Sequence, residues 1–398
     1  YINAVKRDTS SGFPFIQMNN FTRKDIFGAG DDYDLSSQQC QILKRRVEGI
    51  IEKAKEGIVL DHYFVDTLKD ERKPIHKAHK TRLFSAGAID YLVVCKMYFN
   101  GVVALLSKNR NWCHVSVGTN VYSQDWSEIV KVLHRKSKNI VAGDFEGFDA
   151  SQHQSLLEAC GEVLIELSRR FLKATDEDIK VMRVLLVSLF NSIHICGSEV
   201  YQWTHSLPSG HYLTAIINSI FVNISFARVW QLCFDLRSYA FTRLFWKECG
   251  LVAYGDDHLL SVPDSRLSKF NQMTMPGFMK EIGLGYTMED KDSNAECKSR
   301  SITEVSYLKR RFLLEKVMNR WLCPLSLSTV LEFPMWNRKC PDQVAQTIVE
   351  LDKAIEELSL HEEEIWNKWL PTLLRCGEEL GHYSVYKDQS ETRLVATS

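Results

Sequence analysis

Two aspartates separated by four residues form the first acidic motif that could support chemistry. Asp144 and Asp149 follow the apolar, strand-like run Asn139–Gly143. Along a continuing strand, their odd separation would send the two side chains to opposite faces. Gly147 lies between them, however, and permits a turn that would return Asp149 to the same surface. Taken alone, this string is more typical of a strand end followed by a helix with an N-cap aspartate.

Two adjacent aspartates form the second acidic motif. Asp256 and Asp257 follow Gly255 between the apolar runs 251–254 and 258–262, and this pattern predicts a β-hairpin with the acids at its tip. Aspartate is common in turns, so the motif in isolation indicates no more than a turn. Two neighbouring carboxylates repel each other, however, and a bound divalent cation would offset that repulsion.

The two acidic motifs together suit phosphoryl transfer. That chemistry uses two hard cations about 4 Å apart, held by carboxylate oxygens. Asp144 and Asp256 would supply the pair if their strand ends are neighbours in one sheet, with Asp257 as an auxiliary or orienting ligand. Mg²⁺ is the expected ion, and Mn²⁺ could substitute for it. Glu146, between the first two acids, is expected to be solvated.

A basic cluster precedes the acidic motifs. The segment Lys69–Arg82 holds six lysines or arginines against two acids. Such a run is about as often a solvated face as a functional one. Its proline and its lack of helical periodicity favour an extended segment that aims several cations at one place, as a triphosphate requires.

The segment Pro208–Asn218 has the pattern of a flexible loop that enters a helix. Ser209 suits an N-cap position, and Thr214 and Asn218, four residues apart, would share one face of the helix. In isolation, a capped helix with two buried polar groups is the simpler interpretation. The functional alternative is a hydrogen-bonding surface for a ribose 2′-hydroxyl, the group that distinguishes RNA from DNA precursors.

The composition is that of an ordinary globular protein whose length calls for two or three subdomains. The net charge of −1 predicts no affinity for nucleic acid by itself, so RNA binding would depend on local clusters of cations. Eleven cysteines without a CxxC pair argue against a zinc ribbon and suit free thiols in a reducing compartment. The most apolar long run, Tyr212–Cys233, is interrupted by polar residues, so direct membrane insertion is not expected.

Helical patterns occur between the strand-like runs, at 38–57, 155–171 and 214–233. In the last part of the chain, apolar residues recur every three or four positions from Val344 to Leu358, with acids between them, which predicts an amphipathic helix. Strands mixed with segregated helices indicate an α+β protein that ends in an all-helical part.

Taken in order, these motifs resemble those of picornavirus-like RNA-dependent RNA polymerases from positive-strand viruses. Seven segments between about residues 9 and 311 carry the resemblance. In chain order they resemble motif G (Thr9–Pro14), motif F (Lys69–Arg82), motif A (Asp144–Asp149), motif B (Ser209–Asn218), motif C (Tyr254–Asp257), motif D (Asp290-Lys291) and motif E (Tyr307–Arg310). One Gly-Asp-Asp is a weak signal, whereas seven motifs in order are highly specific.

The resemblance implies a right-hand fold with fingers, palm and thumb, in which an antiparallel palm sheet is flanked by helices. The expected divisions are fingers at 1–100, palm at 101–154, a fingers insertion at 155–205, palm at 206–311 and a helical thumb at 312–398. Members of the family usually carry a longer N-terminal fingers segment. The chain begins at Tyr1 without an initiator methionine, and we expect it to be a fragment or a piece excised from a longer precursor.

The resemblance also implies roles for individual residues. Those expected to bind the triphosphate or check the ribose are Lys69, Lys80, Arg82, Asp149, Ser209, Gly210, Thr214 and Asn218. Lys291 would be the general acid that protonates the pyrophosphate leaving group. Residues expected to contact template or nascent RNA are Thr9, Ser10, Gly12, Pro14, Lys309 and Arg310.

The function implied is templated RNA synthesis from ribonucleoside triphosphates, with catalysis by Asp144, Asp256, Asp257 and Lys291. Expected partners are RNA template and primer, a protein primer and other viral replication proteins. The expected location is the host cytoplasm, in replication complexes held on membranes by those partners. A reverse transcriptase is the enzyme alternative, although it typically closes its sugar site with an aromatic residue. A non-catalytic RNA-binding or scaffold protein is the other, and the presence of every expected acid argues against it.

Overall fold

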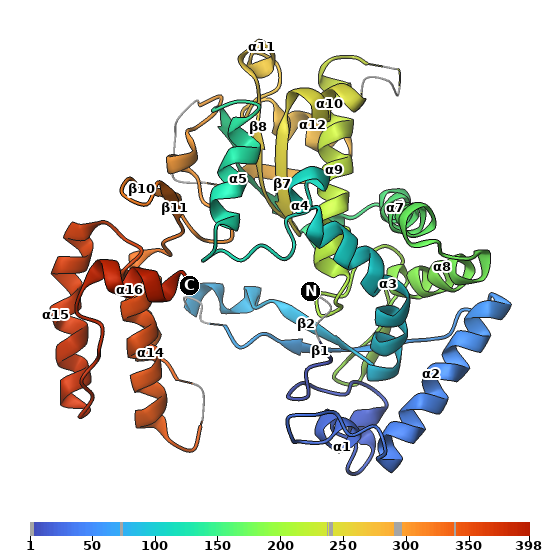
Figure 1. Ribbon diagram of the computed structural model, residues 1–398. Coiled ribbons are helices and arrows are strands. Elements are labelled where there is room, and N and C mark those ends of the chain that lie inside the picture. The colour runs from blue at the N-terminus through green and yellow to red at the C-terminus, as the bar shows by residue number, and fades with distance from the viewer. Residues whose placement is uncertain (1–3, 72–74, 237, 239–241, 290–296, 338–339) are drawn as a thin grey trace.

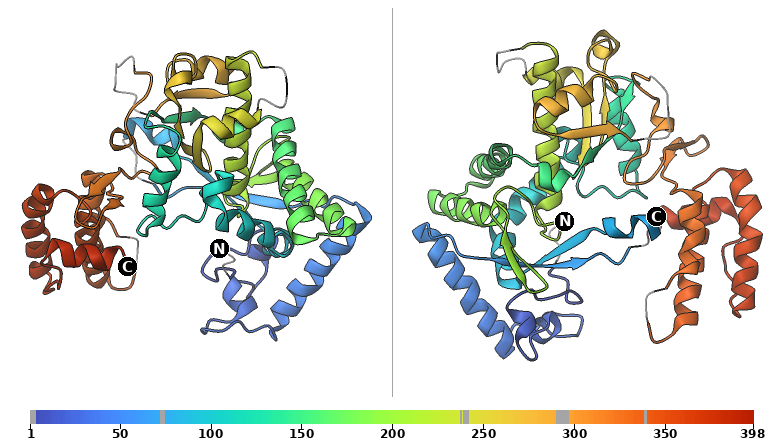
Figure 2. Two further views of the ribbon diagram at one scale, coloured as in Figure 1. Left: turned by 45° about the horizontal axis from the view of Figure 1, so that its top comes forward. Right: turned by 180° about the vertical axis from the view of Figure 1, so that it is seen from behind.

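The structure is a computed structural model that describes residues 4–71, 75–236, 238, 242–289, 297–337 and 340–398. Figure 1 shows three groups of elements along the chain: N-terminal helices and a sheet, a central layer of strands and helices, and a set of C-terminal helices that stands apart. The views in Figure 2 show the segment around β10 and β11 between these last helices and the centre.

The N-terminal part is built around a four-stranded sheet in the order β2-β1-β5-β6. β1 pairs antiparallel with β2 and parallel with β5, and β5 pairs antiparallel with β6. The elements of this part are η1 (Phe15–Gln17), α1 (Arg23–Phe27), α2 (Gln38–Glu56), β1 (Tyr63–Leu68), η2 (Ile75–Lys80), β2 (Leu83–Gly87), α3 (Ile89–Lys108), α7 (Gln154–Leu172), α8 (Asp176–Phe190), β5 (Ile193–Cys196) and β6 (Glu199–Gln202).

The carboxylate of Asp66 ties all four strands of this sheet together. Asp66 lies on β1 and accepts hydrogen bonds from Ser85 of β2 (2.6 Å), His194 of β5 (2.9 Å) and Tyr201 of β6. Ser192 completes the chain through His194 Nε2 at 2.9 Å. The Asp66 side chain is 1% exposed. Burial opposes its ionisation, but the three hydrogen bonds outweigh burial and hold the pKa of Asp66 below its ordinary value.

The central part holds a three-stranded antiparallel sheet in the order β3-β8-β7 and a separate antiparallel pair, β4 with β9. Helix α9 packs on β7, α7, α10 and α12, and α5 packs on β7 and β8 from another side. The elements of this part are α4 (Arg110–Cys113), α5 (Asp125–His134), β3 (Ile140–Val141), β4 (Gly143–Glu146), α6 (Phe148–Ser151), α9 (Thr214–Cys233), α10 (Thr242–Glu248), β7 (Gly250–Tyr254), β8 (Asp257–Ser261), α11 (Asp264–Leu267), α12 (Met275–Glu281), β9 (Gly285–Met288) and η4 (Ile302–Glu304).

The C-terminal part has its own core, in which one face of α14 packs against α13, α15 and α16. The amphipathic pattern expected here is confirmed, since Leu351, Ile355 and Leu358 on α14 are buried. The elements of this part are β10 (Leu313–Glu315), β11 (Arg320–Leu322), α13 (Leu327–Glu332), η5 (Phe333–Met335), α14 (Gln343–Leu358), α15 (Glu363–Glu379) and α16 (Gln389–Ala396).

Two local expectations from the sequence are wrong. Ser209 does not cap a helix, because α9 begins at Thr214 with Leu213 at its N-cap, and the Ser209 hydroxyl donates to Leu83 O instead (3.2 Å). The basic segment is not extended throughout, because Ile75–Lys80 forms a 3₁₀ helix. The two ends of the segment lie side by side, because Lys69 N donates a backbone hydrogen bond to Arg82 O at 2.9 Å.

Two of the described helices, α3 and α9, have the length and apolar composition of a membrane-spanning segment. Their most apolar 18-residue windows are 50% and 72% buried inside the protein, respectively. Core helices commonly have this composition, so the pattern is weak evidence for a membrane segment.

We predict that Asp66→Asn destabilises the N-terminal part by roughly 2 kcal/mol, because a buried hydrogen bond to a charged group contributes about 1.5–3 kcal/mol. Chemical denaturation at neutral pH measures the change, and Asp70→Asn, an exposed change of the same type, is the control. Since the pKa of Asp66 is lowered in the folded protein, its contribution is present above the unfolded value and is lost as the pH falls below about 4. An Asp66→Asn protein as stable as Asp70→Asn at pH 7 would contradict this account.

Candidate active site

Asp144 lies within a short strand that the backbone holds beside the central sheet. The strand-like run breaks at Ala142, whose N–H donates to the side chain of Gln272 (3.1 Å) and not to a neighbouring strand. The chain then continues as β4, where Asp144 pairs with Thr287 of β9. Asp144 therefore lies inside a strand of its own, β4, and not in a loop at the end of β3. Its side chain is exposed.

The predicted hairpin is confirmed, with Asp256 at its tip. Tyr254 of β7 pairs with Asp257 of β8, which leaves Gly255 and Asp256 as a two-residue loop. Ser219 of α9 anchors this loop, because its hydroxyl oxygen accepts a hydrogen bond from Gly255 N at 2.8 Å. Asp256 is exposed at the tip, whereas Asp257 is half-buried and accepts a hydrogen bond from Leu308 N at 2.6 Å.

The acids of both motifs lie close enough to influence each other's ionisation. Burial raises the pKa of Asp257 to about 7, and the negative charges of Asp256, Glu289 and Asp144 raise it further. The hydrogen bond from Leu308 N acts in the opposite direction and lowers it. Asp144 also acts on the neighbouring His258, the pKa of which burial lowers to about 4. The structure therefore brings Asp144, Asp256 and Asp257 into one electrostatic neighbourhood.

This acidic neighbourhood has the chemistry of a site for hard divalent cations. Its groups are carboxylates, which offer only acceptor oxygens, and their mutual repulsion is what a bound cation would relieve. Within the described residues, no three His, Cys, Asp or Glu side chains already converge as a metal-binding group. The donor set thus fits Mg²⁺ or Mn²⁺, with side chains that must draw closer around the ion.

Asp149 returns to the same surface, as the turn at Gly147 allows. Gly147 adopts φ +54° and begins the short helix α6, in which Asp149 occupies the first turn. Burial raises the pKa of Asp149 and the charge of Asp256 raises it further, whereas Lys69 and a hydrogen bond from Asn218 lower it. Asn218 is buried on α9, and Gln152 donates to its Oδ1 at 2.7 Å.

The loop before α9 lies directly against strand β2. A side chain at Gly210 would meet Ser85 O at 2.1 Å, so only glycine allows the loop to approach this closely. Thr214 is buried on the same face of α9 as Asn218, and its hydroxyl donates to Pro208 O at 2.7 Å. Ser206 links the loop to motif A by donating to Asp149 O at 3.0 Å.

The basic segment contributes Arg82 and Lys69 to this neighbourhood. Two nitrogens of the Arg82 guanidinium, Nε and Nη2, donate to Oε2 of Glu71 (3.0 and 2.8 Å), and the Arg82 side chain is 61% exposed. This pair raises the pKa of Arg82, and the charge of Asp256 adds to the effect. Lys80 ends η2, but its side chain lies outside the part of the chain that the structure describes.

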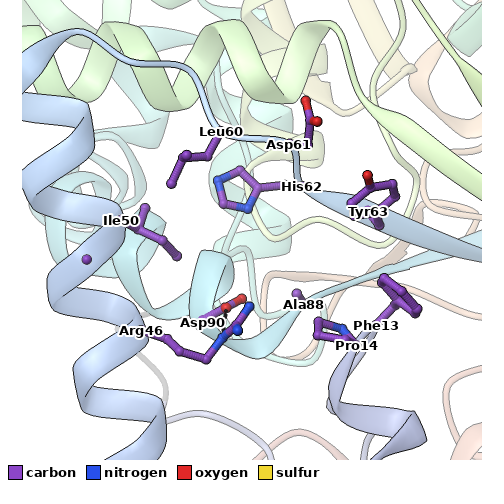
Figure 3. Close-up of a pocket in the computed structure, with 11 residues that line it drawn as sticks. Phe13, Pro14, Arg46, Ile50, Leu60, Asp61, His62, Tyr63, Ala88 and Asp90 are labelled. Atoms are coloured by element: carbon purple, nitrogen blue, oxygen red, sulfur yellow. Dashed lines mark hydrogen bonds and ion pairs between the residues drawn. The ribbon is translucent and has the colours of Figure 1, made fainter.

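The N-terminal loop that resembles motif G lines two cavities. Pro14 and Phe13 line one of about 360 Å³, which also contains the ion pair of Arg46 with Asp90 and the ring of His62 (Figure 3). Thr9 and Ser10 line the other, of about 490 Å³, together with residues of β2 and of the loop before α9, including Gly210. Gly12 closely approaches Gly87 O at the end of β2. The second cavity therefore lies between this loop, β2 and the loop of motif B, whereas the first lies between this loop, α2 and the starts of β1 and α3.

Arg310 does not have the place expected of an RNA-binding residue. It is buried and forms a bidentate pair with Glu357 of α14 (3.0 and 2.8 Å), and its remaining bonds go to Cys323 O and Tyr122 Oη. The structure corrects this prediction, because a guanidinium with those partners joins the C-terminal helices to the centre. Lys309, in contrast, is exposed with φ +62°. Asp290 and Lys291 lie outside the described residues.

Sequence reasoning missed the residues that hold the predicted ones in place. Ser219 fixes the hairpin loop, Gln152 fixes Asn218, and Glu289 adds charge next to Asp257. Ser219 and Gln152 each lie within a few residues of a motif, which is the only signal the sequence offered. Their contacts cross 36 and 66 residues of chain, so local periodicity carried no information about them.

Comparison of the sequence with known proteins identifies viral polymerases as its relatives. Residues 1–375 match the family model described as viral RNA-dependent RNA polymerase. The replicase polyprotein of acute bee paralysis virus is 37% identical over 391 residues, which cover 95% of this chain and 20% of that polyprotein. The replicase polyprotein of cricket paralysis virus is 35% identical, and this chain covers 22% of its length. The chain thus spans about one fifth of the length of these relatives.

Comparison of the structure gives the same result for the fold. The Sicinivirus 3Dpol RNA-dependent RNA polymerase superposes with a TM-score of 0.79 over 99% of this chain and 77% of that one, at 19% sequence identity. The likeness, together with a helical content of about 51%, confirms the predicted α+β polymerase fold.

We predict that Arg310→Met destabilises the protein by about 3 kcal/mol or more, because it leaves Glu357 buried without its cation. Lys309→Met, one residue earlier at an exposed position, is the matched control and should change stability by less than about 0.5 kcal/mol. Chemical denaturation of both variants provides the measurement. Equal stability of the two variants would show that the Arg310 pair does not hold the C-terminal helices to the centre.

Proposed function

The chain belongs to the family of viral RNA-dependent RNA polymerases, and we propose that it extends RNA by templated transfer of nucleotides from ribonucleoside triphosphates. The observation that supports this most is the meeting of both acidic motifs. Asp144, Asp256 and Asp257 share one electrostatic neighbourhood, and the charge of Asp256 also reaches Asp149 and Arg82. Cation, ribose and phosphate sites would thus adjoin each other.

We propose that Asp144 and Asp256 hold Mg²⁺, with Asp257 orienting the first ligands. The bound ions would supply Lewis-acid stabilisation of charge on the attacking and leaving oxygens. Mn²⁺ would be accepted by the same oxygen donors. The hydrogen bond from Leu308 N keeps one oxygen of Asp257 facing the protein, which suits an auxiliary role better than a bridging one.

Arg82 and Lys69 are the proposed phosphate-binding residues among those with described side chains. Arg82 offers a planar fork of donors that a carboxylate of Glu71 now occupies, and a triphosphate presents the same acceptor geometry with more charge. Nucleotide binding would therefore exchange Glu71 for phosphate oxygens at Arg82. Lys80 is proposed to act alongside them, and Lys291 to protonate the leaving pyrophosphate, on the basis of sequence.

The proposed ribose check is made by Asp149 and Asn218. The Asp149 carboxylate receives a hydrogen bond from Asn218 and has further acceptor positions, so it can accept another hydrogen bond from a 2′-hydroxyl. Ser209, Gly210 and Thr214 would shape this pocket through the close contact of their loop with β2.

We further propose that the three groups of elements are fingers, palm and thumb, with boundaries near residues 100, 154, 205 and 311. RNA would follow the loop Thr9–Pro14 on the template side and Lys309 on the product side, since Thr9, Ser10 and Lys309 are exposed. Because its relatives are polyproteins, other viral proteins are the proposed partners, including a protein primer, in cytoplasmic complexes held on membranes.

Asp256→Asn should lower the rate of RNA primer extension by at least about a hundredfold while leaving the unfolding midpoint unchanged, because the amide cannot offset the charge of the cations. Glu146→Gln, an exposed acid-to-amide change within motif A at a residue with no proposed role, is the control and should retain activity. Extension by Asp256→Asn at a rate near that of wild type would refute the metal assignment.

The wild-type protein should prefer ATP over 2′-deoxyATP on an RNA template by on the order of a hundredfold or more. The reason is that a site built to hydrogen-bond a hydroxyl leaves buried polar groups unpaired when that hydroxyl is missing. Single-nucleotide incorporation with each nucleotide measures the ratio. Equal use of both nucleotides would favour a reverse transcriptase-like sugar site.

A further inference from the structure

Gln152 is a buried residue that no sequence motif identified. It follows the short helix α6, three residues after Asp149, and is 0% exposed. Its side-chain Nε2 donates to Asn218 Oδ1 on α9 at 2.7 Å, across 66 residues of chain. The contact thus joins the segment that carries Asp149 to the helix that carries its hydrogen-bond partner.

The chemistry of the three side chains fixes how the Asn218 amide must face. An ionised Asp149 carboxylate only accepts hydrogen bonds, so the Asn218 group that bonds to it must be the Nδ2 amino group. The carbonyl Oδ1 then faces the other way, into the interior, where it needs a donor. Gln152 Nε2 is the donor that meets it.

Hydrogen bonds fix both the main chain and the side chain of Asp149. The hydroxyl of Ser206 donates to Asp149 O at 3.0 Å and anchors the backbone of α6. Asn218 meets the carboxylate, and Gln152 keeps Asn218 from rotating its amide by half a turn. A rotated amide would turn its carbonyl toward the carboxylate and replace a hydrogen bond with a repulsion between oxygens.

We propose that Gln152 is a positioning residue for sugar selection, which orients Asn218 and through it the Asp149 carboxylate that meets the ribose 2′-hydroxyl. The inference rests on the proposed polymerase function and adds to it a specificity determinant outside the motifs. Gln152 touches neither the ribose nor the phosphates and acts only through Asn218.

The other polar atom of the Gln152 side chain, Oε1, makes it possible to test a positioning role separately from a structural one. Gln152 Oε1 is buried and has no hydrogen-bond partner within the part of the chain that the structure describes. Replacing Gln152 by methionine removes that unpaired acceptor and leaves Asn218 Oδ1 unpaired in its place, so the two costs offset each other. Stability should therefore change little, while the orientation of Asn218 is lost.

The test compares Gln152→Met and Gln152→Glu with wild type in the chain of residues 1–398. Gln154→Met, the same change at an exposed position two residues away, is the matched control. Each protein incorporates one nucleotide on an RNA primer-template, with ATP or 2′-deoxyATP at several concentrations. The readout is the ratio of kcat/KM for the two nucleotides, which is independent of the fraction of inactive protein because both values come from one preparation.

Gln152→Met should lower the preference for ATP about tenfold, with its unfolding midpoint close to that of wild type, since one hydrogen bond that orients the amide is lost. Gln152→Glu should lower the preference further, because an ionised carboxylate offers only acceptors and draws the Asn218 amino group away from Asp149. Gln154→Met should keep the wild-type ratio.

An unchanged nucleotide ratio in both Gln152 variants would overturn the inference, whatever their stability. So would a loss of activity toward both nucleotides in equal proportion, which indicates a structural role alone. Failure of the proposed function gives a different result, because wild type and Gln154→Met would then incorporate neither nucleotide.

Discussion

Mutual repulsion between carboxylates is the constraint on which the central site depends. Burial raises the pKa of Asp257 to about 7, and the negative charges of Asp256, Glu289 and Asp144 add to that effect. A fold that gathers such charges must hold them by other contacts. Here Ser219 holds the hairpin loop, Leu308 N holds Asp257, and β9 holds β4. Divalent cations would turn this repulsion into attraction, which explains why the acids are gathered at all.

The contacts around the acids also connect sites that must act together. Helix α9 contributes Ser219 to the hairpin loop and Asn218 to Asp149, so one helix sets the distance between the proposed cation and ribose sites. The sheet that Asp66 ties together carries Lys69 and Arg82 at the ends of β1 and β2. Arg310 and Glu357 join the C-terminal helices to this centre. Buried polar groups therefore tie the N-terminal sheet together and join the C-terminal helices to the centre.

Patterns that are local in the chain could be read from the sequence. The hairpin at Gly255-Asp256 follows from apolar runs on both sides of a turn, and α9 occupies the expected residues 214–233 because its apolar positions are nearly continuous. What failed depends on contacts between distant segments. Ser209 bonds to Leu83 and not to a helix end, and Arg310 is buried against Glu357, 47 residues later. Charge and spacing cannot reveal whether an arginine faces solvent or a buried acid.

The most direct test of the central claim is a crystal structure of this chain with RNA primer-template, Mn²⁺ and a non-hydrolysable ribonucleotide, with the anomalous signal of manganese recorded. Two peaks about 4 Å apart, contacted by carboxylate oxygens of Asp144 and Asp256, are the predicted result. Manganese bound away from these two residues, or Asp144 and Asp256 too far apart to share the ions, would contradict the account.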